Sequence, residues 1–149
     1  ITNSVSAQIY KDMGLEDVTL SFELSEKGIK NISTDIQKGA YIYGYLPIML
    51  LRNCPQKSVD GCLKCSGKSA LTDRKGIEFP LLCQSKKYSV LHNSVPLYIG
   101  DKNLSRLDFV TFYFTIEDKK ECEKIYQAYL NGKAPEGKKT NGLYTRELL

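Results

Sequence analysis

Hydrophobic and polar positions in the first third of the chain follow two different periods. Apolar residues spaced four apart predict a helix over residues 3–13. Over residues 17–24 apolar side chains occupy every second position, which predicts a strand, and a short second helix is predicted over 25–32. Residues 40–51 are apolar at nearly every position, as expected of one strand buried on both faces of a sheet. The order helix, strand, helix, strand with short links indicates parallel βα units.

Beyond Arg52 the pattern changes. Gly, Pro, Asn and Asp recur through residues 52–87 and break any long helix or strand, so we expect a loop-rich segment with little core of its own. Within it, residues 71–83 are predicted to form a hairpin with its turn at 73–76. Further elements are predicted as strands over 95–99 and 108–115 and a helix over 117–130. Residues 133–149 are expected to be a basic, partly mobile tail.

Length and composition suit a globular chain that buries a real core. The chain has 149 residues, of which 42% are hydrophobic and 26% are charged. Its longest apolar run, residues 40–51, is shorter than the roughly 20 residues that a membrane-spanning helix needs, so we expect no membrane protein. The chain begins without a methionine and without a hydrophobic leader segment. We therefore expect a piece of a longer, cytoplasmic protein.

The cysteines give the strongest chemical signal in the sequence. Four of the five fall within one short segment; they are Cys54, Cys62, Cys65 and Cys83, called here the cysteine tetrad. The two central cysteines are separated by two residues in a turn-rich stretch, a spacing that lets both sulfur atoms bind one centre. Four thiolates suit a closed, structural zinc site or an iron–sulfur cluster, and spacing does not choose between them. The alternatives are unligated cysteines or a redox pair.

For three single residues outside the tetrad, a chemical role is compared with a structural one. Cys122 falls on the apolar side of the helix predicted over 117–130, which favours a role in the core. His92 is the only histidine, and the sequence lacks an HExxH motif, so a hydrogen-bonding structural histidine is favoured over a catalytic base. Glu23 lies near the end of the strand predicted over 17–24 and is the one candidate catalytic carboxylate; the catalytic residues are otherwise unknown.

Positive charge gathers in the same segment as the tetrad. The whole chain has 21 Lys and Arg against 17 Asp and Glu, a net charge of +4, and basic residues outnumber acidic ones over 52–87. A basic loop beside a metal can bind phosphates, and Phe79 or Tyr88 can stack on unpaired bases, so contact with RNA is one hypothesis. The candidate contacts are Arg52, Lys57, Lys64, Lys68, Arg74 and Lys75. The alternative is a solvated face that compensates the charge of four thiolates.

Four stretches, in order along the chain, carry a resemblance to a known family. They are VTLSFELS, YGYLPIMLLRNCP, GCLKCSGKSALTDRKGIEFPLLC and LHNSVPLYIGD. Together they resemble the collagenase-like peptidase family U32, over most of the chain. The resemblance implies an α/β fold with these parts: the last βα units of a TIM-like (β/α) barrel over 1–51, a four-cysteine metal-binding knuckle over 52–87, a βα segment over 88–132 and a tail over 133–149. The rest of the barrel is then expected outside this chain.

The resemblance also implies a function. The family name implies a peptidase of unassigned catalytic type that acts on a peptide, of which this fragment alone is expected to be inactive. Other members are similar to accessory proteins for the hydroxylation of tRNA, ribosomal RNA or ubiquinone precursors, in which four cysteines hold a four-iron four-sulfur cluster. Cys54 matches one of those ligands, but another ligand falls where this sequence has Pro47, and the later thiols are spaced more closely here. The cluster is therefore the expected cofactor, with structural zinc in a purely structural domain as the alternative.

Overall fold

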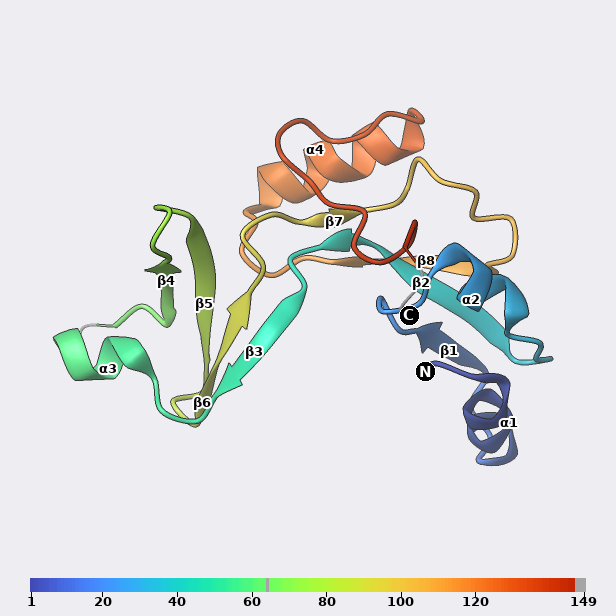
Figure 1. Cartoon of the computed structure of the whole chain (residues 1–149), viewed down its shortest axis with the longest axis horizontal. Helices are drawn as coiled ribbons and strands as arrows, with labels where there is room; N and C mark the ends of the chain where they lie inside the picture. The colour runs from blue at the N-terminus through green and yellow to red at the C-terminus, as the bar shows by residue number, and fades with distance from the viewer. Residues whose placement is uncertain (64, 147–149) are drawn as a thin grey trace. The chain divides into compact units, whose positions relative to one another are not determined.

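The computed structural model describes residues 1–63 and 65–146 of the chain. Contacts within it define two compact units, one formed by Ile1–Gly44 together with the chain from Leu97 onward, and the other by Tyr45–Pro96. Each unit contains a four-stranded sheet (Figure 1). The limits of the units differ from the ranges expected from sequence, because the segment 52–87 lies inside the second unit with a strand on either side.

The first unit is a mixed α/β structure. Its elements are α1 (Ser4–Asp12), β1 (Asp17–Leu20), α2 (Glu26–Asn31), β2 (Gln37–Gly44), β7 (Leu97–Tyr98), β8 (Phe109–Tyr113) and α4 (Lys119–Leu130). Strand β2 pairs in parallel with both β1 and β8, while β7 pairs antiparallel with the end of β2. The α/β class and the parallel pairing expected from the hydrophobic pattern are confirmed in this unit.

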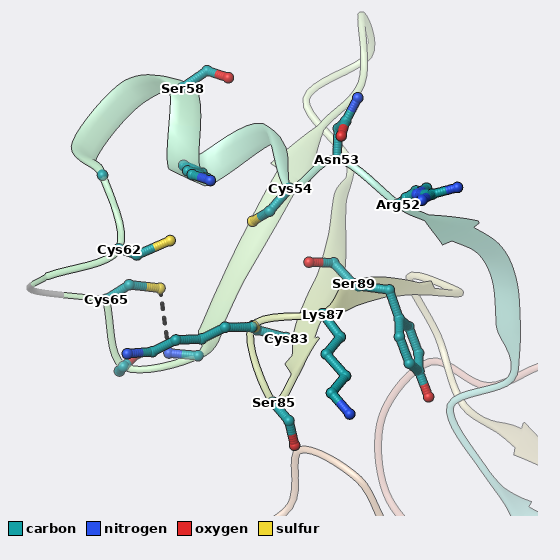
Figure 2. A pocket seen from close by; sticks show the side chains of 16 residues that line it. Arg52, Asn53, Cys54, Ser58, Cys62, Cys65, Cys83, Ser85, Lys87 and Ser89 are labelled. Atoms are coloured by element: carbon teal, nitrogen blue, oxygen red, sulfur yellow. Dashed lines mark hydrogen bonds between the residues drawn. The ribbon is translucent and has the colours of Figure 1, made fainter.

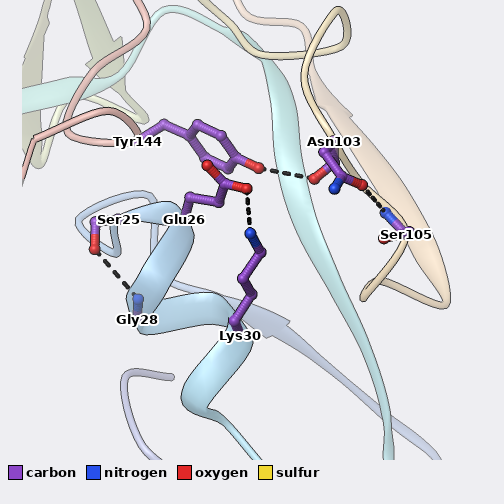
Figure 3. Close-up of polar contacts among 7 residues, drawn as sticks. All are labelled: Ser25, Glu26, Gly28, Lys30, Asn103, Ser105 and Tyr144. Atoms are coloured by element: carbon purple, nitrogen blue, oxygen red, sulfur yellow. Dashed lines mark hydrogen bonds and ion pairs between the residues drawn. The ribbon is translucent and has the colours of Figure 1, made fainter.

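The three helices of the first unit begin at residues whose side chains cap free backbone amides. Asn3 caps α1, and the Ser25 hydroxyl accepts a hydrogen bond from the Gly28 amide at the start of α2 (Figure 3). At the start of α4, Asp118 and Glu121 form a reciprocal capping box. Such caps satisfy amides that lack a partner in the first turn, and they explain why these helix starts are readable in the sequence.

Aromatic packing holds α4 on the sheet of the first unit. Tyr43, Tyr98 and Ile125 form a buried cluster from β2, β7 and α4, and Phe112 of β8 packs against it. The Phe112 ring meets the Tyr129 ring of α4 edge-on, with centroids 5.4 Å apart. Edge-on geometry is favourable for aromatic pairs, so this cluster packs α4 against the sheet of the first unit.

Residues 133–146, the described part of the tail expected over 133–149, are attached to the first unit by hydrogen bonds, and residues 147–149 lie outside the described residues. Tyr144 is buried, and its hydroxyl donates to the Asn103 carbonyl at 2.8 Å (Figure 3). The Tyr144 carbonyl accepts from the Glu26 amide at the same distance. Upstream, the Thr140 carbonyl accepts from the Tyr98 amide. A buried tyrosine with a partner for its hydroxyl anchors a segment that composition alone marks as loose.

The second unit is an antiparallel sheet with one short helix. Its elements are β3 (Pro47–Leu51), α3 (Pro55–Asp60), β4 (Lys68–Thr72), β5 (Glu78–Gln84) and β6 (Tyr88–His92), and the strand order is β3-β6-β5-β4. The hairpin expected over 71–83 is confirmed as β4 and β5. Its turn is closed by Asp73, whose carboxylate accepts from the amides of Lys75 and Ile77.

The single strand expected over 40–51 is wrong. The apolar run forms two strands, β2 and β3, which belong to different sheets. β3 is an edge strand whose residues are mostly exposed, not a strand buried on both faces, and Pro47 begins it. The sequence has no polar turn signal between them. The break follows Gly44, whose backbone lies so close to that of Tyr113 that a Cβ atom would clash.

Regular structure also replaces part of the predicted loop-rich segment. Helix α3 and strand β6 were not expected from the pattern, because both are short, α3 has Val59 as its one hydrophobic side chain, and the apolar residues of β6 do not alternate strictly with polar ones. The described residues form two four-stranded sheets and no closed barrel, so the structure supports the α/β class without the barrel. In the part of the chain that the structure describes, no helix is both long enough and apolar enough to cross a membrane.

Candidate metal centre

A cavity of about 740 Å³ lies in the second unit and is lined by the whole cysteine tetrad (Figure 2). The tetrad reaches the cavity from three places in the fold. Cys54 precedes α3, Cys62 and Cys65 lie in the loop after α3, and Cys83 lies on β5. In Figure 2 the sulfur atoms of the first three face the same space. The four residues singled out by spacing are therefore brought to one site.

Cys54 is set up to be the most readily ionised of these thiols. The Ser89 hydroxyl, a hydrogen-bond donor beside the sulfur, is the largest cause that lowers the pKa of Cys54, and the backbone amide of Lys57 lowers it further. Burial raises the pKa by less than either of these lowers it, though by more than the Gln56 amide lowers it. Ser89 is fully buried and lines the cavity, and among the described residues its Oγ has no hydrogen-bond partner in this structure, so the hydroxyl remains available to donate to a Cys54 thiolate. A thiol stabilised as thiolate is the form that binds metals.

The loop that carries Cys62 and Cys65 is tied to the sheet through Gly67. The Gly67 amide donates to Cys65 Sγ at 3.3 Å, and the Gly67 carbonyl accepts from the Cys83 amide at 2.8 Å. Gly67 has a φ of 81°, a left-handed conformation that glycine adopts without a steric penalty. One glycine thus links the two-cysteine turn to the strand that supplies the fourth thiol.

The donor chemistry of the tetrad fits a thiolate-bound metal, although the thiols do not meet at ligand distance. All four are free cysteines. Over residues 1–63 and 65–146, no group of three or more His, Cys, Asp or Glu lies close enough to hold a metal ion. The four thiols therefore line one cavity without forming a closed metal site. A closed site requires a shift of the loops that carry the thiols.

Some of the basic residues expected to contact RNA line the cavity, and others do not. Arg52 and Lys57 line the cavity, whereas Lys68 of β4 and the β4–β5 turn residues Arg74 and Lys75 do not. The remaining candidate, Lys64, falls outside the described residues. Of the two aromatic residues proposed to stack on bases, Tyr88 lines the cavity and Phe79 does not.

Two basic residues of the cavity were missed as contacts. Lys86 and Lys87 lie between β5 and β6 and line the cavity, and so does Ser85 before them. Strand β6 would have identified them, but its sequence signal is weak, because two of its buried residues, Ser89 and Leu91, are one polar and one apolar side chain. With that strand assigned, a second hairpin would have brought its turn beside the tetrad.

The turn between β5 and β6 is strained. Ser85 and Lys86 have φ values of 52° and 60°, and the Lys87 amide donates to the Gln84 carbonyl at 3.0 Å. Positive φ at both central residues defines a type I′ turn, for which Asn-Gly is the preferred sequence. A left-handed conformation costs a residue with a side chain about 1–2 kcal/mol. The chain therefore accepts strain where the turn lines the cavity.

The other single residues considered from sequence do not line this cavity. His92 is buried on β6, as a structural histidine would be. Glu23 belongs to the first unit, where it is exposed between β1 and α2. Cys122 belongs to α4 of the first unit, and burial, followed by the charge of Glu117, raises the pKa of its thiol.

Comparisons with known proteins add no relative. A scan against protein-family models, a search of curated proteins and a search of solved structures each find no match to this chain. The chemistry of the site therefore stands on its own residues, and the likeness to peptidase family U32 remains a prediction from sequence motifs.

Proposed function

We propose that the second unit is a metal-binding module of a U32-type protein, in which the cysteine tetrad binds one metal centre and fixes α3 and the following loop to the sheet. The observation that supports this most is that all four thiols line one cavity. They come from three separate parts of the unit, so their gathering is a property of the fold and not of sequence proximity alone.

The small core of the second unit supports a stabilising role for the metal. The unit is about 50 residues long, and Leu81 and Leu91 are its buried hydrophobic side chains in the described part of the chain. A domain of this size buries too little apolar surface to be more than marginally stable. Metal binding adds free energy to folding at such sites, because the preformed site does not exist in the unfolded chain.

The proposed ligands are the four thiolates, with the Gly67 amide and the Ser89 hydroxyl as hydrogen-bond donors to them. Donors to ligating sulfur atoms orient the ligands and tune the centre. A zinc ion bound in this way would be purely structural, while a four-iron four-sulfur cluster, which the family resemblance favours, would supply electron transfer. In a U32-type protein this module would accompany a peptidase or hydroxylation activity located in other parts of the protein.

Metal analysis of the full chain, purified without oxygen, tests this proposal. We expect one zinc ion or one iron–sulfur cluster per chain, with broad visible absorption in the case of iron. Cys65→Ser should lose the metal, because a thiolate ligand is removed from a closed four-sulfur site.

Cys122→Ser is the matched control, since it makes the same chemical change in the first unit, at a residue that does not line the cavity. It should keep the full metal content. Equal metal content in the two variants, or a wild-type chain that binds no metal, would overturn the proposal.

A further inference from the structure

We propose that the cavity also binds a phosphate group, through four basic side chains at its edge. They are Arg52, Lys57, Lys86 and Lys87, called here the basic quartet. All four side chains are exposed and line the same cavity as the thiols. The inference is independent of which metal the tetrad binds.

Charge is the first argument for an anionic ligand. Among the described residues that line the cavity there is no Asp or Glu, and no member of the basic quartet forms a salt bridge with another described residue. Four thiolates around one divalent ion leave a net charge of about −2, which is half of what four cations can neutralise. The cavity thus has positive charge beyond the needs of a metal–thiolate centre.

The chemistry of the lining favours phosphate over a simple counterion. Arg52 carries a planar fork of N–H donors that matches phosphate oxygens, and lysine binds phosphate as a point charge. Asn53 and Ser85 line the cavity beside them and add neutral hydrogen-bond donors. Together these groups offer several donors to one tetrahedral anion.

The strained turn is the second, independent argument. Lys86 has a left-handed backbone in a turn that would prefer Asn-Gly, and it lines the cavity together with Lys87. Backbone strain that persists in a fold is commonly found at ligand-binding segments, where the surrounding structure maintains it. Here the strain keeps two adjacent lysines on the cavity.

Binding of inorganic phosphate and of a short single-stranded RNA to the metal-loaded full chain tests the proposal, by calorimetry in a buffer without other anions of high charge. Phosphate should bind, and the double variant K86A/K87A should weaken its binding at least tenfold with unchanged metal content. The control is R74A/K75A, which removes two charges from the β4–β5 turn, outside the cavity lining. It should bind phosphate as the wild type does.

The two probes also separate the sources of the phosphate. Binding of free phosphate with no tighter binding of RNA identifies a small phosphorylated ligand. Tighter, salt-dependent binding of RNA identifies a phosphodiester backbone, and K86A/K87A should then reduce the salt slope by about 1.4, because each lost contact on a single strand removes about 0.7.

Three outcomes would overturn the inference. One is that neither probe binds to the metal-loaded chain. Another is that R74A/K75A weakens binding as much as K86A/K87A does, which would indicate general attraction to a basic surface. The third is that K86A/K87A loses metal along with phosphate binding, which would show that the lysines only compensate the thiolates. Metal content measured in every variant distinguishes this failure from a failure of the metal site itself.

Discussion

The two units of this chain are stabilised in different ways. Within the described residues, the first unit buries residues from all three of its helices and from β1, β2 and β7, with an aromatic cluster between α4 and the sheet. The second unit has a complete sheet but few buried hydrophobic residues, and polar Ser89 and His92 are among its most buried side chains. The comparison indicates that a regular sheet does not by itself supply a sufficient core, and that the second unit needs another source of stability.

The ionisation of the cysteine thiols also differs between the two units. The Cys54 thiol of the second unit accepts hydrogen bonds that lower its pKa, whereas burial and nearby carboxylates raise the pKa of the Cys122 thiol in the first. The first environment favours a thiolate ligand and the second a neutral packing residue. Identical side chains thus have different roles because of their immediate surroundings.

Removal of the metal should have the largest effect and should separate the two units. For structural zinc, binding contributes about 10–16 kcal/mol in small domains, so a strong chelator is expected to unfold the second unit. The first unit, with its own core, should keep its structure. Hydrogen exchange followed by mass spectrometry measures both units in one sample, and equal loss of protection in the two, or none in either, would contradict the comparison.

Relief of turn strain should have a smaller effect than removal of the metal. It should raise the stability of the second unit and weaken phosphate binding. Lys86→Gly removes a left-handed cost of about 1–2 kcal/mol and adds about 0.4–1 kcal/mol of chain entropy to the unfolded state. We expect the metal-loaded second unit to gain about 0.5–1 kcal/mol of unfolding free energy while phosphate binding weakens.

Lys75→Gly is the matched control for Lys86→Gly, because Lys75 lies in the other hairpin turn and has no left-handed backbone. It should lower stability slightly and leave phosphate binding unchanged. Urea denaturation measures both variants, and a loss of stability in Lys86→Gly would show that the turn is not strained.

The smallest predicted effect is a difference in the pH at which the Cys54 and Cys122 thiols react. In metal-free, reduced protein, the lowered pKa of Cys54 means that its thiolate forms at lower pH, and the raised pKa of Cys122 means that its thiolate forms at higher pH. Rates of alkylation, measured by peptide mass spectrometry as pH rises from 6 to 10, should therefore increase first at Cys54. An increase that comes first at Cys122 would contradict these environments.

Local signals in the sequence were sufficient for much of the fold. Helix starts at Asn3, Ser25 and Asp118 are determined by side chains that cap the following amides, so they are visible without tertiary structure. The β4–β5 turn at Asp73 is local in the same way. The division of residues 40–51 between two sheets was not predictable, because it depends on pairing with strands distant in the sequence, β8 for the first half and β6 for the second.

The candidate site was predicted only in part for a similar reason. The cysteine tetrad was found because thiols are few and their spacing is informative, and the structure brings all four to one cavity. Lys86, Lys87 and Ser89 were missed because their position depends on the pairing of β5 with β6, which a short, weakly patterned strand does not reveal. The expected contacts Arg74 and Lys75 were chosen by charge alone and lie in the β4–β5 turn, outside the cavity lining.

X-ray absorption spectroscopy of the metal-loaded chain tests the central claim most directly, because it reports the atoms bound to the metal. The account predicts four sulfur ligands, at about 2.3 Å if the metal is zinc, and loss of the bound metal and its spectrum in Cys65→Ser. A first shell dominated by oxygen or nitrogen, or a spectrum that Cys65→Ser leaves unchanged, would contradict it.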